Sequence, residues 1–567
     1  MIDIKIIERK ADKNKVNELS NKYNISKDIV SFLLGRNVPE DIVPLLVSKD
    51  ELELMPYDTL TNVKEAAALI NKYLTTNKAN IYIYGDYDSD GVNATYIMYQ
   101  ALIELAEALE VNANVYYHLP NREEGYGLSM DWCKAIDKTN ALVITVDNGI
   151  TKKEEVEYLH SNGVEVLITD HHKPQPGQTP DCLIVDAHLN DINNVNACGL
   201  CGAAVAFKVI AYLYDAYNNY DFTFIKKYVA HVGIATITDV MPFTKENVIF
   251  ISNTLKYLND YPYENEDYAP VSESIYYYAE CNKRSKTTSK DIAFGFGPQI
   301  NSCGRMGDIQ VAMDFMLSTD EDELADMFKR MCDLNEARKT KTRETTACIE
   351  PPEVTDLALI VRLNNVEGIA GSIASNLCEQ YNMPVIVFSN DVSILSGSAR
   401  CPECYDIQWL LRNTDCEIEF GGHASAAGLS IKAKDYDKFK DSFNKAVSKA
   451  PVITSINDTL YVDKVITSSD LNKYTLTQYD NVLFFNEFTR PVYAIENVQI
   501  KGYHVSKNNP NNICFHIKTK TKEVKLWCWG FAETYKMLGE PSLVNMIGQL
   551  EIFNNMFVIN MIDIEAV

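Results

Sequence analysis

The chain has 567 residues, with 46% hydrophobic and 23% charged side chains, proportions that are ordinary for a globular protein. This length exceeds what a single hydrophobic core supports, so we expect roughly three or four domains. No apolar run approaches the roughly 20 residues of a membrane-spanning helix, and the first residues lack the apolar segment of a signal peptide, so we expect a cytoplasmic protein without a membrane partner. The formal net charge of −25 argues against a protein that coats nucleic acid, although a local basic channel is compatible with it.

The 14 cysteines are scattered, mostly in apolar surroundings that are typical of reduced core residues. Cys198 and Cys201 form one C-x-x-C pair, and Cys401 and Cys404 form another. A structural zinc ion needs four ligands, and about 200 residues separate the two pairs. Their spacing therefore gives only a weak indication of zinc.

After a polar, helical N-terminal region, short apolar runs alternate with amphipathic stretches, which predicts a parallel sheet covered by helices. We expect its strands at residues 81–84, 114–119, 142–146, 164–169 and 183–185. Helices are expected between them, for example at residues 93–109 and 151–160. In sheets of this kind, ligands bind beyond the carboxyl ends of the strands.

Acidic and imidazole side chains follow several of these strands directly. They are Asp86, Asp88 and Asp90 in GDYDSDG, Asp147 in VDNG, Asp170, His171 and His172 in TDHH, and Asp239 after a helical stretch. Any one of these clusters alone is better explained as a solvated turn. Solvated turns do not explain four such clusters at one sheet edge. Carboxylates this close raise one another's pKa unless a cation neutralises them. The pattern predicts two divalent cations, Mn²⁺ or Mg²⁺.

The second half of the chain predicts a long helix at about 318–346, followed by a second α/β unit. This unit contains GSAR (397–400) and FGGHASAAG (420–428). The glycines of the latter would let a phosphate backbone approach main-chain amides, but a tight turn explains them equally well. The chain has no G-x-x-x-x-G-K-[ST] motif, so an ATP-driven activity is not expected.

The last ~110 residues read as short alternating strands and predict a small β-barrel. Residues 501–525 hold six lysines against Glu523 alone, which makes this window basic in an acidic chain. Lysines beside aromatic side chains are typical of surfaces that bind single-stranded nucleic acid. For one of Trp527 and Trp529, however, strand alternation makes burial in the barrel core the better explanation.

The order GDYDSDG, VDNG, TDHH and TDVMP resembles the four motifs of the DHH phosphoesterase superfamily. The stretches NREEGYGL, CGLCGAAVAFK, PQINSCGRMGD, GSAR and FGGHASAAG resemble the pattern of the RecJ single-strand-specific 5′→3′ exonucleases. The resemblance covers nearly the whole chain from about residue 20, and the ordered set of motifs is highly specific.

The resemblance implies the roles of individual residues. The metal ligands would be Asp86, Asp88, Asp90, Asp147, His171, His172 and Asp239. Asp90, Asp147 and His172 would be catalytic, with Asp147 bridging the ions, although His172 could instead contact the scissile phosphate. The DNA-binding residues would be Arg122, Arg305, Ser398, Arg400, His423, Lys518, Lys520 and Trp529. Gln299 and Val366 are two positions at which the chain departs from the family pattern.

The implied fold class is α/β, with a parallel-sheet DHH domain joined by a long helix to a second α/β (DHH-associated) domain, and then an OB-fold. We expect an N-terminal helical segment at 1–50, the DHH catalytic domain at 51–250, a helical region with the connecting helix at 251–350, the substrate-binding domain at 351–452 and the OB-fold at 455–567.

The implied function is a single-strand-specific 5′→3′ DNA exonuclease that uses two divalent metal ions in repair, recombination or replication. The expected partners are single-stranded DNA and a single-strand-binding protein or helicase, and the expected state is a monomer. One alternative is a phosphodiesterase of the same superfamily that acts on cyclic dinucleotides or short RNA, which would not need the barrel. A non-catalytic scaffold is disfavoured because the ligand set is complete.

Overall fold

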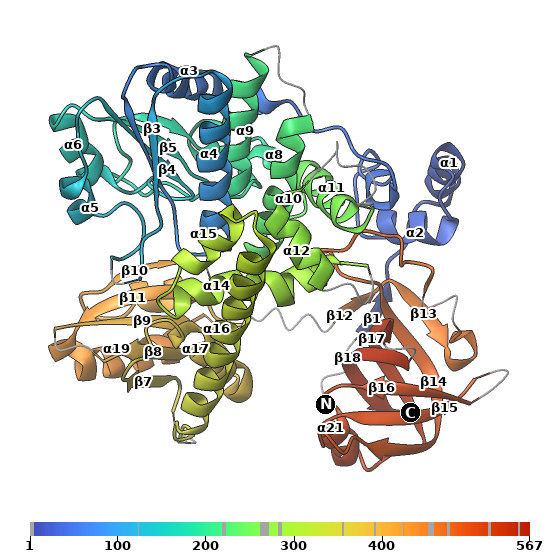
Figure 1. The fold of residues 1–567 in the computed structure, drawn as a ribbon. Coiled ribbons are helices and arrows are strands. Elements are labelled where there is room, and N and C mark those ends of the chain that lie inside the picture. Colours follow the sequence, from blue (N-terminus) through green and yellow to red (C-terminus); the bar gives the residue numbers. More distant parts are fainter. Residues whose placement is uncertain are drawn as a thin grey trace. The chain divides into compact units, whose positions relative to one another are not determined.

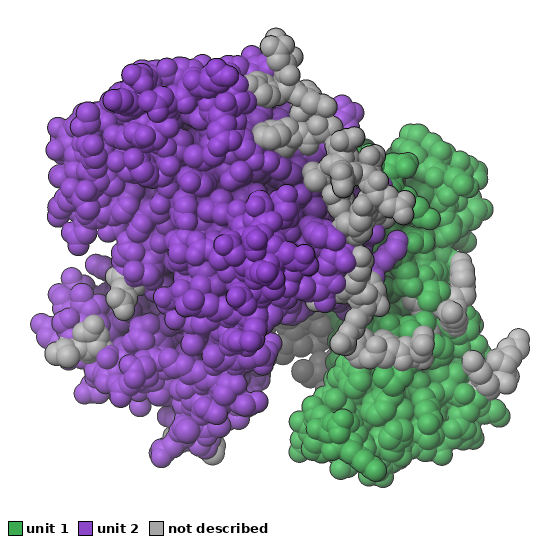
Figure 2. All heavy atoms as spheres, viewed as in Figure 1, with its two compact units in different colours: residues 1–52, 456–567 green, residues 53–455 purple. Residues whose placement is uncertain are grey.

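The computed structural model describes residues 5–122, 124–217, 223–260, 271–281, 286–353, 356–390, 393–422, 424–451, 459–472, 477–519, 523–553 and 556–567. The chain divides into two units, one of residues 53–455 and one of residues 1–52 with 456–567 (Figure 2). Among the predicted site residues, His423 and Lys520 lie outside the described residues.

The larger unit contains a five-stranded sheet in the order β3-β2-β4-β5-β6, and every pairing in it is parallel (Figure 1). Its strands are β2 (Asn80–Tyr84), β3 (Asn114–His118), β4 (Ala141–Val146), β5 (Glu165–Thr169) and β6 (Leu183–Val185). The central strand β4 has the sequence ALVITV and is buried at every position, as expected for a strand with helices on both faces. The predicted parallel sheet is confirmed.

Helices cover both faces of this sheet, with α5 and α6 on one side and α4 and α9 on the other (Figure 1). The helices around the sheet are α3 (Val63–Leu74), α4 (Ser89–Ala108), α5 (Met130–Ala135), α6 (Lys153–Ser161), α7 (Ala187–Asn190), α8 (Val195–Cys198) and α9 (Gly202–Asp215). Those that follow are α10 (Thr223–Thr238), α11 (Lys245–Asp260), α12 (Glu273–Cys281), α13 (Ser289–Asp291), α14 (Gly297–Arg305), α15 (Gln310–Leu317) and α16 (Glu321–Ala347).

Helix α16 is 27 residues long and leads into a second five-stranded sheet in the order β10-β11-β9-β8-β7. Here only β7 and β8 are parallel, and the other pairings are antiparallel. The elements are β7 (Leu359–Leu363), α17 (Ala370–Tyr381), β8 (Val385–Ser389), β9 (Ile394–Arg400), α18 (Ile407–Arg412), β10 (Glu419–Gly422), β11 (Ala426–Lys432) and α19 (Tyr436–Lys449).

The smaller unit joins the two ends of the chain. Strand β1 (Lys5–Glu8), in the region that the sequence indicated as helical, pairs in parallel with β12 (Thr459–Val462) and precedes helices α1 (Lys13–Tyr23) and α2 (Lys27–Gly35). Arg36 donates to both carboxylate oxygens of the buried Asp463, from Nε at 2.9 Å and from Nη2 at 2.6 Å. This bidentate pair fixes the N-terminal helices to the C-terminal strands.

Five of the six remaining strands described in the smaller unit form a closed ring, because β14 pairs with both β15 and β17, and β13 adds to β14 outside the ring. The ring continues from β15 to β16, then to β18 and back to β17. The elements are β13 (Lys464–Thr467), β14 (Val492–Val505), β15 (Ile513–Lys518), β16 (Glu523–Cys528), α21 (Ala532–Met537), β17 (Leu543–Phe553) and β18 (Met556–Ala566). We call this C-terminal structure the strand ring.

The 14 cysteines are all described and none is disulfide-bonded. A search of the described helices finds none with the length and apolar character that crossing a membrane requires.

Candidate metal centre and anion pocket

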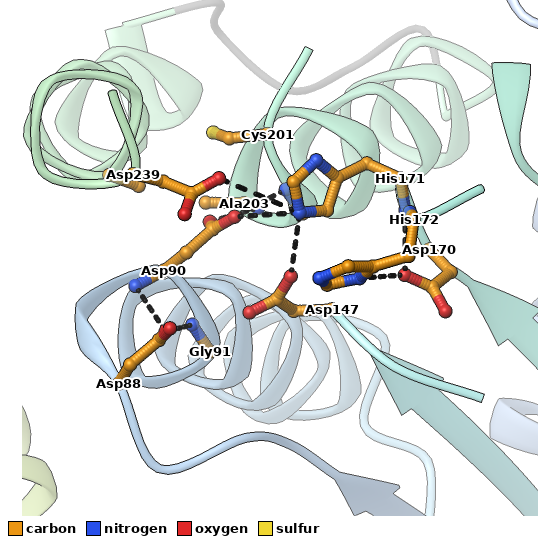
Figure 3. Close-up of polar contacts among 12 residues, drawn as sticks. Asp88, Asp90, Gly91, Asp147, Asp170, His171, His172, Cys201, Ala203 and Asp239 are labelled. Carbon is orange, nitrogen blue, oxygen red and sulfur yellow. Dashed lines mark hydrogen bonds and ion pairs between the residues drawn. The ribbon is translucent and has the colours of Figure 1, made fainter. Parts of the chain in front are cut away.

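The carboxyl edge of the parallel sheet gathers the predicted metal ligands (Figure 3). Asp86 and Asp88 follow β2, Asp147 follows β4, His171 and His172 follow β5, and Asp239 follows α10. Three overlapping groups have donor atoms within 4.8 Å of one another. They are Asp86, Asp88 and Asp147; Asp90, His171 and Asp239; and Asp147, His171 and His172. The structure thus brings all seven predicted ligands together.

Two helix N-termini hold the first acids in place. Asp88 caps α4, and its Oδ1 accepts hydrogen bonds from the backbone N–H of Asp90 at 3.0 Å and of Gly91 at 3.1 Å. Asp90 in turn accepts from the first amides of α9, those of Gly202 at 2.6 Å and Ala203 at 2.8 Å. Both helix dipoles favour negative charge at these positions.

Asp147 sits in a left-handed backbone conformation, with φ of 61°, directly after the buried strand β4. The carboxylate is packed against the start of α9 so closely that a Cβ on Gly202 would lie 2.5 Å from the Asp147 Cβ. A residue other than glycine would therefore push the carboxylate out of the cluster. A strained backbone and a required glycine at one point are typical of a functional site.

The imidazole of His171 lies in the middle of three carboxylates. Its Nε2 is 3.1 Å from Oδ1 of Asp147 and 3.7 Å from oxygens of both Asp90 and Asp239. A hydrogen bond to the Leu200 backbone also acts on this ring, in the way that metal-binding histidines are usually oriented through their second nitrogen.

Burial makes this concentration of charge unfavourable in the absence of a cation. Burial and the Asp90 carboxylate raise the pKa of Asp147 well above its usual range, and burial with Asp88 raises the pKa of Asp86 to about 8. Burial and the neighbouring His172 lower the pKa of His171 to about 3, so this imidazole does not supply a compensating charge.

The donor set fits divalent cations. Among the described residues, no hydrogen-bond donor satisfies the buried Oδ1 atoms of Asp86 and Asp147. Carboxylate oxygens with a minority of neutral imidazole nitrogens suit Mn²⁺ and Mg²⁺. Bound cations would neutralise the aspartates and complete the coordination of these orphaned oxygens.

His172 differs from His171 because it has an ionic partner of its own. Its Nδ1 lies 2.8 Å from Oδ1 of the fully buried Asp170, and the Tyr126 hydroxyl lies 3.1 Å from the same nitrogen. Burial lowers the pKa of His172, but the hydrogen bond to Asp170 outweighs this effect and raises the pKa to about 9. The metal-free protein therefore holds His172 as an imidazolium at neutral pH.

Near the metal centre, three of the predicted DNA-binding residues form a cluster of arginines that repel one another. Burial, followed by Arg122 and Arg338, lowers the pKa of Arg305 to about 10, and Arg400 contributes in the same direction. Arg122 lies over the ring of Tyr87 at 4.4 Å, and no described residue accepts a hydrogen bond from its buried Nε. No described carboxylate forms an ion pair with these three arginines. Half-buried cations without carboxylate partners indicate an anion-binding pocket.

Ser398 and Arg400 extend this pocket to the N-terminus of α17. A Cβ on Gly371, in the first turn of that helix, would lie 3.1 Å from Nη2 of Arg400 and 3.4 Å from Oγ of Ser398. Arg400 is further held by Nε, which donates to Ser375 Oγ at 3.2 Å. A helix N-terminus beside a guanidinium and a hydroxyl is well suited to a phosphate group.

In the smaller unit, Trp529 and Lys518 both lie on the surface of the strand ring, where Trp529 is 37% exposed. Trp529 stacks on the half-buried Trp527, with ring centroids 5.8 Å apart and an interplanar angle of 23°. The expectation that one tryptophan belongs to the core is therefore wrong, because both rings pack on the outer face of the strands.

Three residues at the site escaped the sequence analysis as functional candidates. Asp170 was noted only as part of the TDHH pattern, although it orients His172, and Tyr126 had only the NREEGYGL motif to mark it. Arg338 comes from the middle of α16 and donates to Ser302 Oγ at 3.1 Å. No local motif surrounds Arg338, because helix packing rather than chain proximity places it near Arg305.

Comparisons with known proteins match this geometry. The model of the DHH family N-terminal domain matches residues 80–236, and that of the DHHA1 domain matches residues 357–449. The single-stranded-DNA-specific exonuclease RecJ of Haemophilus influenzae is 29% identical over 440 residues, which are 72% of this chain and 72% of the relative.

Two crystal structures of RecJ are similar to the protein. RecJ of Thermus thermophilus in complex with Mn²⁺ has a TM-score of 0.78 and 20% identity, and the match covers 99% of this chain and 79% of that one. An exonuclease RecJ bound to manganese has a TM-score of 0.58 and 26% identity, over 72% of this chain and 100% of that one. The DHH match covers the clustered residues from Asp86 to His172 and ends three residues before Asp239, and the DHHA1 match covers Ser398 and Arg400, so the chain is similar to the RecJ exonucleases in both regions.

Proposed function

We propose that this protein is a single-strand-specific 5′→3′ DNA exonuclease that hydrolyses phosphodiester bonds with two divalent metal ions. The observation that carries the proposal is the position of a carboxylate–imidazole cluster near half-buried arginines that have no described carboxylate partner, all within one unit. The first is chemistry for cleaving a phosphodiester, and the second is chemistry for holding the charged strand. The RecJ relative carries the same description, single-stranded-DNA-specific exonuclease.

The metal ligands in this proposal are Asp86, Asp88, Asp90, Asp147, His171 and Asp239, whereas His172, which was also predicted as a ligand, contacts the substrate. Two Mn²⁺ or Mg²⁺ ions held by these side chains would lower the pKa of an attacking water and stabilise charge on the phosphoryl oxygens. Asp147 and His171 each belong to two of the three ligand groups, and because a carboxylate has two oxygens to share, Asp147 is the better candidate to bridge the ions. Asp90 is held rigidly by the amides of α9, which limits the cost of reorganisation during turnover.

His172 acts on the substrate in this proposal. Because Asp170 keeps the imidazole protonated and fixed, His172 can donate a hydrogen bond to the scissile phosphate while lying within ligand distance of Asp147 and His171. A charge-assisted hydrogen bond to a phosphate is stronger than a neutral one and strengthens as negative charge develops.

The 5′ end of the strand would bind in the anion pocket. Ser398, Arg400 and the N-terminus of α17 would take the terminal phosphate, while Arg122 and Arg305 would hold phosphates nearer the metal centre. His423 is proposed as a further phosphate ligand from its place in the FGGHASAAG motif. A terminal phosphate carries more charge than an internal one, so fixed arginines select for a strand end.

The strand ring would hold the rest of the strand, and we propose that it is an OB-fold. Five strands that close on themselves, with stacked tryptophans and exposed lysine on the outer face, are the features that support this assignment. Lys518, Lys520 and Trp529 are the proposed contacts. The same surface disfavours the small-substrate alternative, which would leave it without a role.

We further propose the domain division given by the sequence, with catalysis in 51–250, substrate binding in 351–452 and the OB-fold in 455–567, joined by a helical region at 251–350 and preceded by a helical segment at 1–50. The protein would act as a cytoplasmic monomer on single-stranded DNA, with a single-strand-binding protein or a helicase as protein partner, in repair, recombination or replication.

A panel of labelled substrates tests the proposal. The full-length protein is incubated with Mn²⁺ and with equal concentrations of single-stranded DNA, single-stranded RNA, blunt duplex DNA and a cyclic dinucleotide. We expect single-stranded DNA to be degraded to short products at a rate far above the others. Preferential hydrolysis of the cyclic dinucleotide or of di- and trinucleotides would contradict the proposal and favour the small-substrate alternative.

A further inference from the structure

The outer face of the strand ring carries a second cluster of metal-binding side chains, far along the chain from the aspartates. His504, Cys514 and His516 have donor atoms within 4.8 Å of one another. His504 lies on β14, and the two others lie on β15, which are neighbouring antiparallel strands. The cluster consists of two imidazoles and one thiol, and it contains no carboxylate ligand.

Strand register explains why these three side chains meet. His504 is directly opposite Cys514, and His516 is two residues further along the same strand, so all three project from one face. They lie beside the turn that connects β14 to β15, where a shared ligand would tie the two strands together. Because all three side chains come from paired strands, the geometry of the cluster is fixed by the strand register and does not depend on a loop.

The spacing suits a tetrahedral metal ion. Nδ1 of His504 and Nε2 of His516 are 3.2 Å apart. Two nitrogens bound at about 2.0–2.1 Å to one Zn²⁺ ion at the tetrahedral angle would be separated by about 3.3–3.4 Å. A hydrogen bond between the rings accounts for the same distance in the metal-free protein, but it gives no role to the thiol.

A carboxylate beside the cluster orients one of its histidines for metal binding. Nδ1 of His516 lies 3.4 Å from Oε1 of Glu523, the arrangement in which a carboxylate fixes a histidine so that its Nε2 is free to bind a metal. Lys525, on the next strand, is the register partner of His516 and places a positive charge beside the cluster. A bound cation would displace the thiol proton.

We propose that His504, Cys514 and His516 form a binding site for a borderline-soft divalent transition metal, of which Zn²⁺ is the best representative. Thiolate and imidazole ligands select Zn²⁺ over the oxygen-preferring Mg²⁺ and Mn²⁺, so the site is chemically distinct from the aspartate-rich centre. Three protein ligands leave the fourth position to water. The site does not depend on the proposed nuclease function.

The site adjoins the aromatic surface of the strand ring. Trp527 lies across from Cys514 on the neighbouring strand, and the His504 ring packs edge-on against it with centroids 5.3 Å apart. Trp527 in turn stacks on Trp529. A metal ion that fixes His504 would therefore also fix the orientation of the paired tryptophans.

Cobalt substitution of the full-length protein tests the proposal directly. The metal-free protein is titrated with Co²⁺, and the thiolate-to-cobalt charge-transfer absorption in the near ultraviolet is recorded. This band requires a bound thiolate, so Co²⁺ in the aspartate-rich centre does not produce it. We expect the wild-type protein to develop the band with one equivalent of thiolate-bound Co²⁺, and we expect Zn²⁺ to abolish it by displacement.

Matched variants assign the band. Cys514→Ser removes the proposed ligand, whereas Cys528→Ser replaces a buried cysteine of β16 that leaves the strand from the opposite face. We expect the band to be lost in the first variant and retained in the second. His504→Gln changes an exposed side chain, so folding is preserved. We expect the Co²⁺ affinity, measured from the titration of the charge-transfer band, to be at least tenfold weaker in this variant.

Three results would overturn the proposal. The first is no thiolate band in the wild-type protein. The second is a band that survives in Cys514→Ser, which would place the metal at another cysteine, such as Cys201 near the aspartate cluster. The third is an unchanged Co²⁺ affinity in His504→Gln, which would leave the imidazole pair as a hydrogen-bonded contact only.

Discussion

Nδ1 of His172 lies 2.8 Å from Oδ1 of Asp170, a carboxylate with no solvent exposure. The backbone amides of His171, His172 and Ile150 also donate to this carboxylate, so it is fixed on every side. The pair makes one of the two adjacent histidines a cation, while its neighbour His171 stays neutral among the aspartates. Two chemically identical residues thus acquire different roles from their surroundings.

Asp170→Asn should lower the activity by about 10–100-fold, the usual effect of removing the partner of a catalytic or metal-binding histidine. The substitution removes the negative charge that holds the pKa of His172 at about 9, so the pKa falls, and the imidazole of the variant is neutral at pH 8 and more often protonated at pH 6. We therefore expect a larger deficit relative to wild type at pH 8 than at pH 6, measured as kcat/KM on single-stranded DNA. Asp137→Asn, at an exposed position, is the control. Equal deficits at both pH values would argue that His172 serves as a neutral metal ligand.

Asp147→Asn should abolish hydrolysis but stabilise the protein in the presence of a chelator. The pKa of Asp147 is raised well above its usual range by burial and by Asp90, so the metal-free fold at neutral pH is destabilised by the cost of burying or neutralising the charge that this carboxylate carries in the unfolded chain. An amide removes this charge, and each kcal/mol gained raises the unfolding temperature of a unit of this size by roughly 1 °C. Scanning calorimetry with and without Mn²⁺ measures the effect, and Asp131→Asn on the exposed face of α5 is the control. A lower unfolding temperature of Asp147→Asn in the chelator would contradict this account.

Affinity for Mn²⁺ should rise with pH between about 6 and 8. Burial and the neighbouring Asp88 raise the pKa of Asp86 to about 8 and that of Asp90 to about 6. Because both folded pKa values lie above the unfolded ones, the metal-free protein is most stable below pH 4 with respect to these groups and loses that stability as the pH rises through 6 and 8. Mn²⁺ must displace the bound protons, which changes affinity by about tenfold per pH unit for each proton. Titration calorimetry in buffers of different ionisation enthalpy counts the protons, and a pH-independent affinity would refute the prediction.

Arg400→Ala should erase most of the preference for a 5′-phosphorylated strand over a 5′-hydroxyl strand. The guanidinium faces the first turn of α17 beside Ser398 and has no described carboxylate partner. Loss of one charge-assisted contact costs about 1.5–3 kcal/mol, or roughly ten- to a hundredfold in kcat/KM. Arg412→Ala removes an exposed arginine of α18 and should leave the preference intact. If Arg400→Ala retained the phosphate preference, end recognition would have to occur elsewhere.

Trp529→Ala should weaken binding of a long single strand by about 1–3 kcal/mol while leaving hydrolysis of short oligonucleotides unchanged. The ring is exposed and stacked on Trp527, which makes it available to a nucleobase. Fluorescence anisotropy with labelled DNA measures the affinity, and Tyr461→Ala, at an exposed aromatic of β12 in the same unit, is the control. Equal affinities of the Trp529 variant and wild type would remove the strand ring from substrate binding.

The sequence predicts those features that depend on local patterns. The strand expected at 142–146 is observed as Ala141–Val146, because a run of β-branched residues flanked by turns has few alternatives. The convergence of Asp147 with His171 then follows from parallel topology, since neighbouring strands end at one edge. The order of the four motifs along the chain predicts the other metal ligands, which are Asp86, Asp88, Asp90, His172 and Asp239.

Contacts set by distant chain segments leave no such signal. The pairing of β1 with β12 joins the two ends of the chain, and neither strand is distinguishable from a loop by its own four residues. Arg338 reaches the arginine cluster only through the packing of α16 on α14. His504 and Cys514 look unrelated along the chain and become neighbours only through the register of two strands.

The most direct test of the central claim is a time course of digestion with single-stranded DNA blocked by a bulky group at either its 5′ or its 3′ end, using the wild-type protein and Asp147→Asn in Mn²⁺. The account predicts that wild type degrades the 3′-blocked strand and not the 5′-blocked one, and that Asp147→Asn binds both strands and degrades neither. Degradation of the 5′-blocked strand by wild type, or near-normal turnover by Asp147→Asn at saturating Mn²⁺, would contradict it.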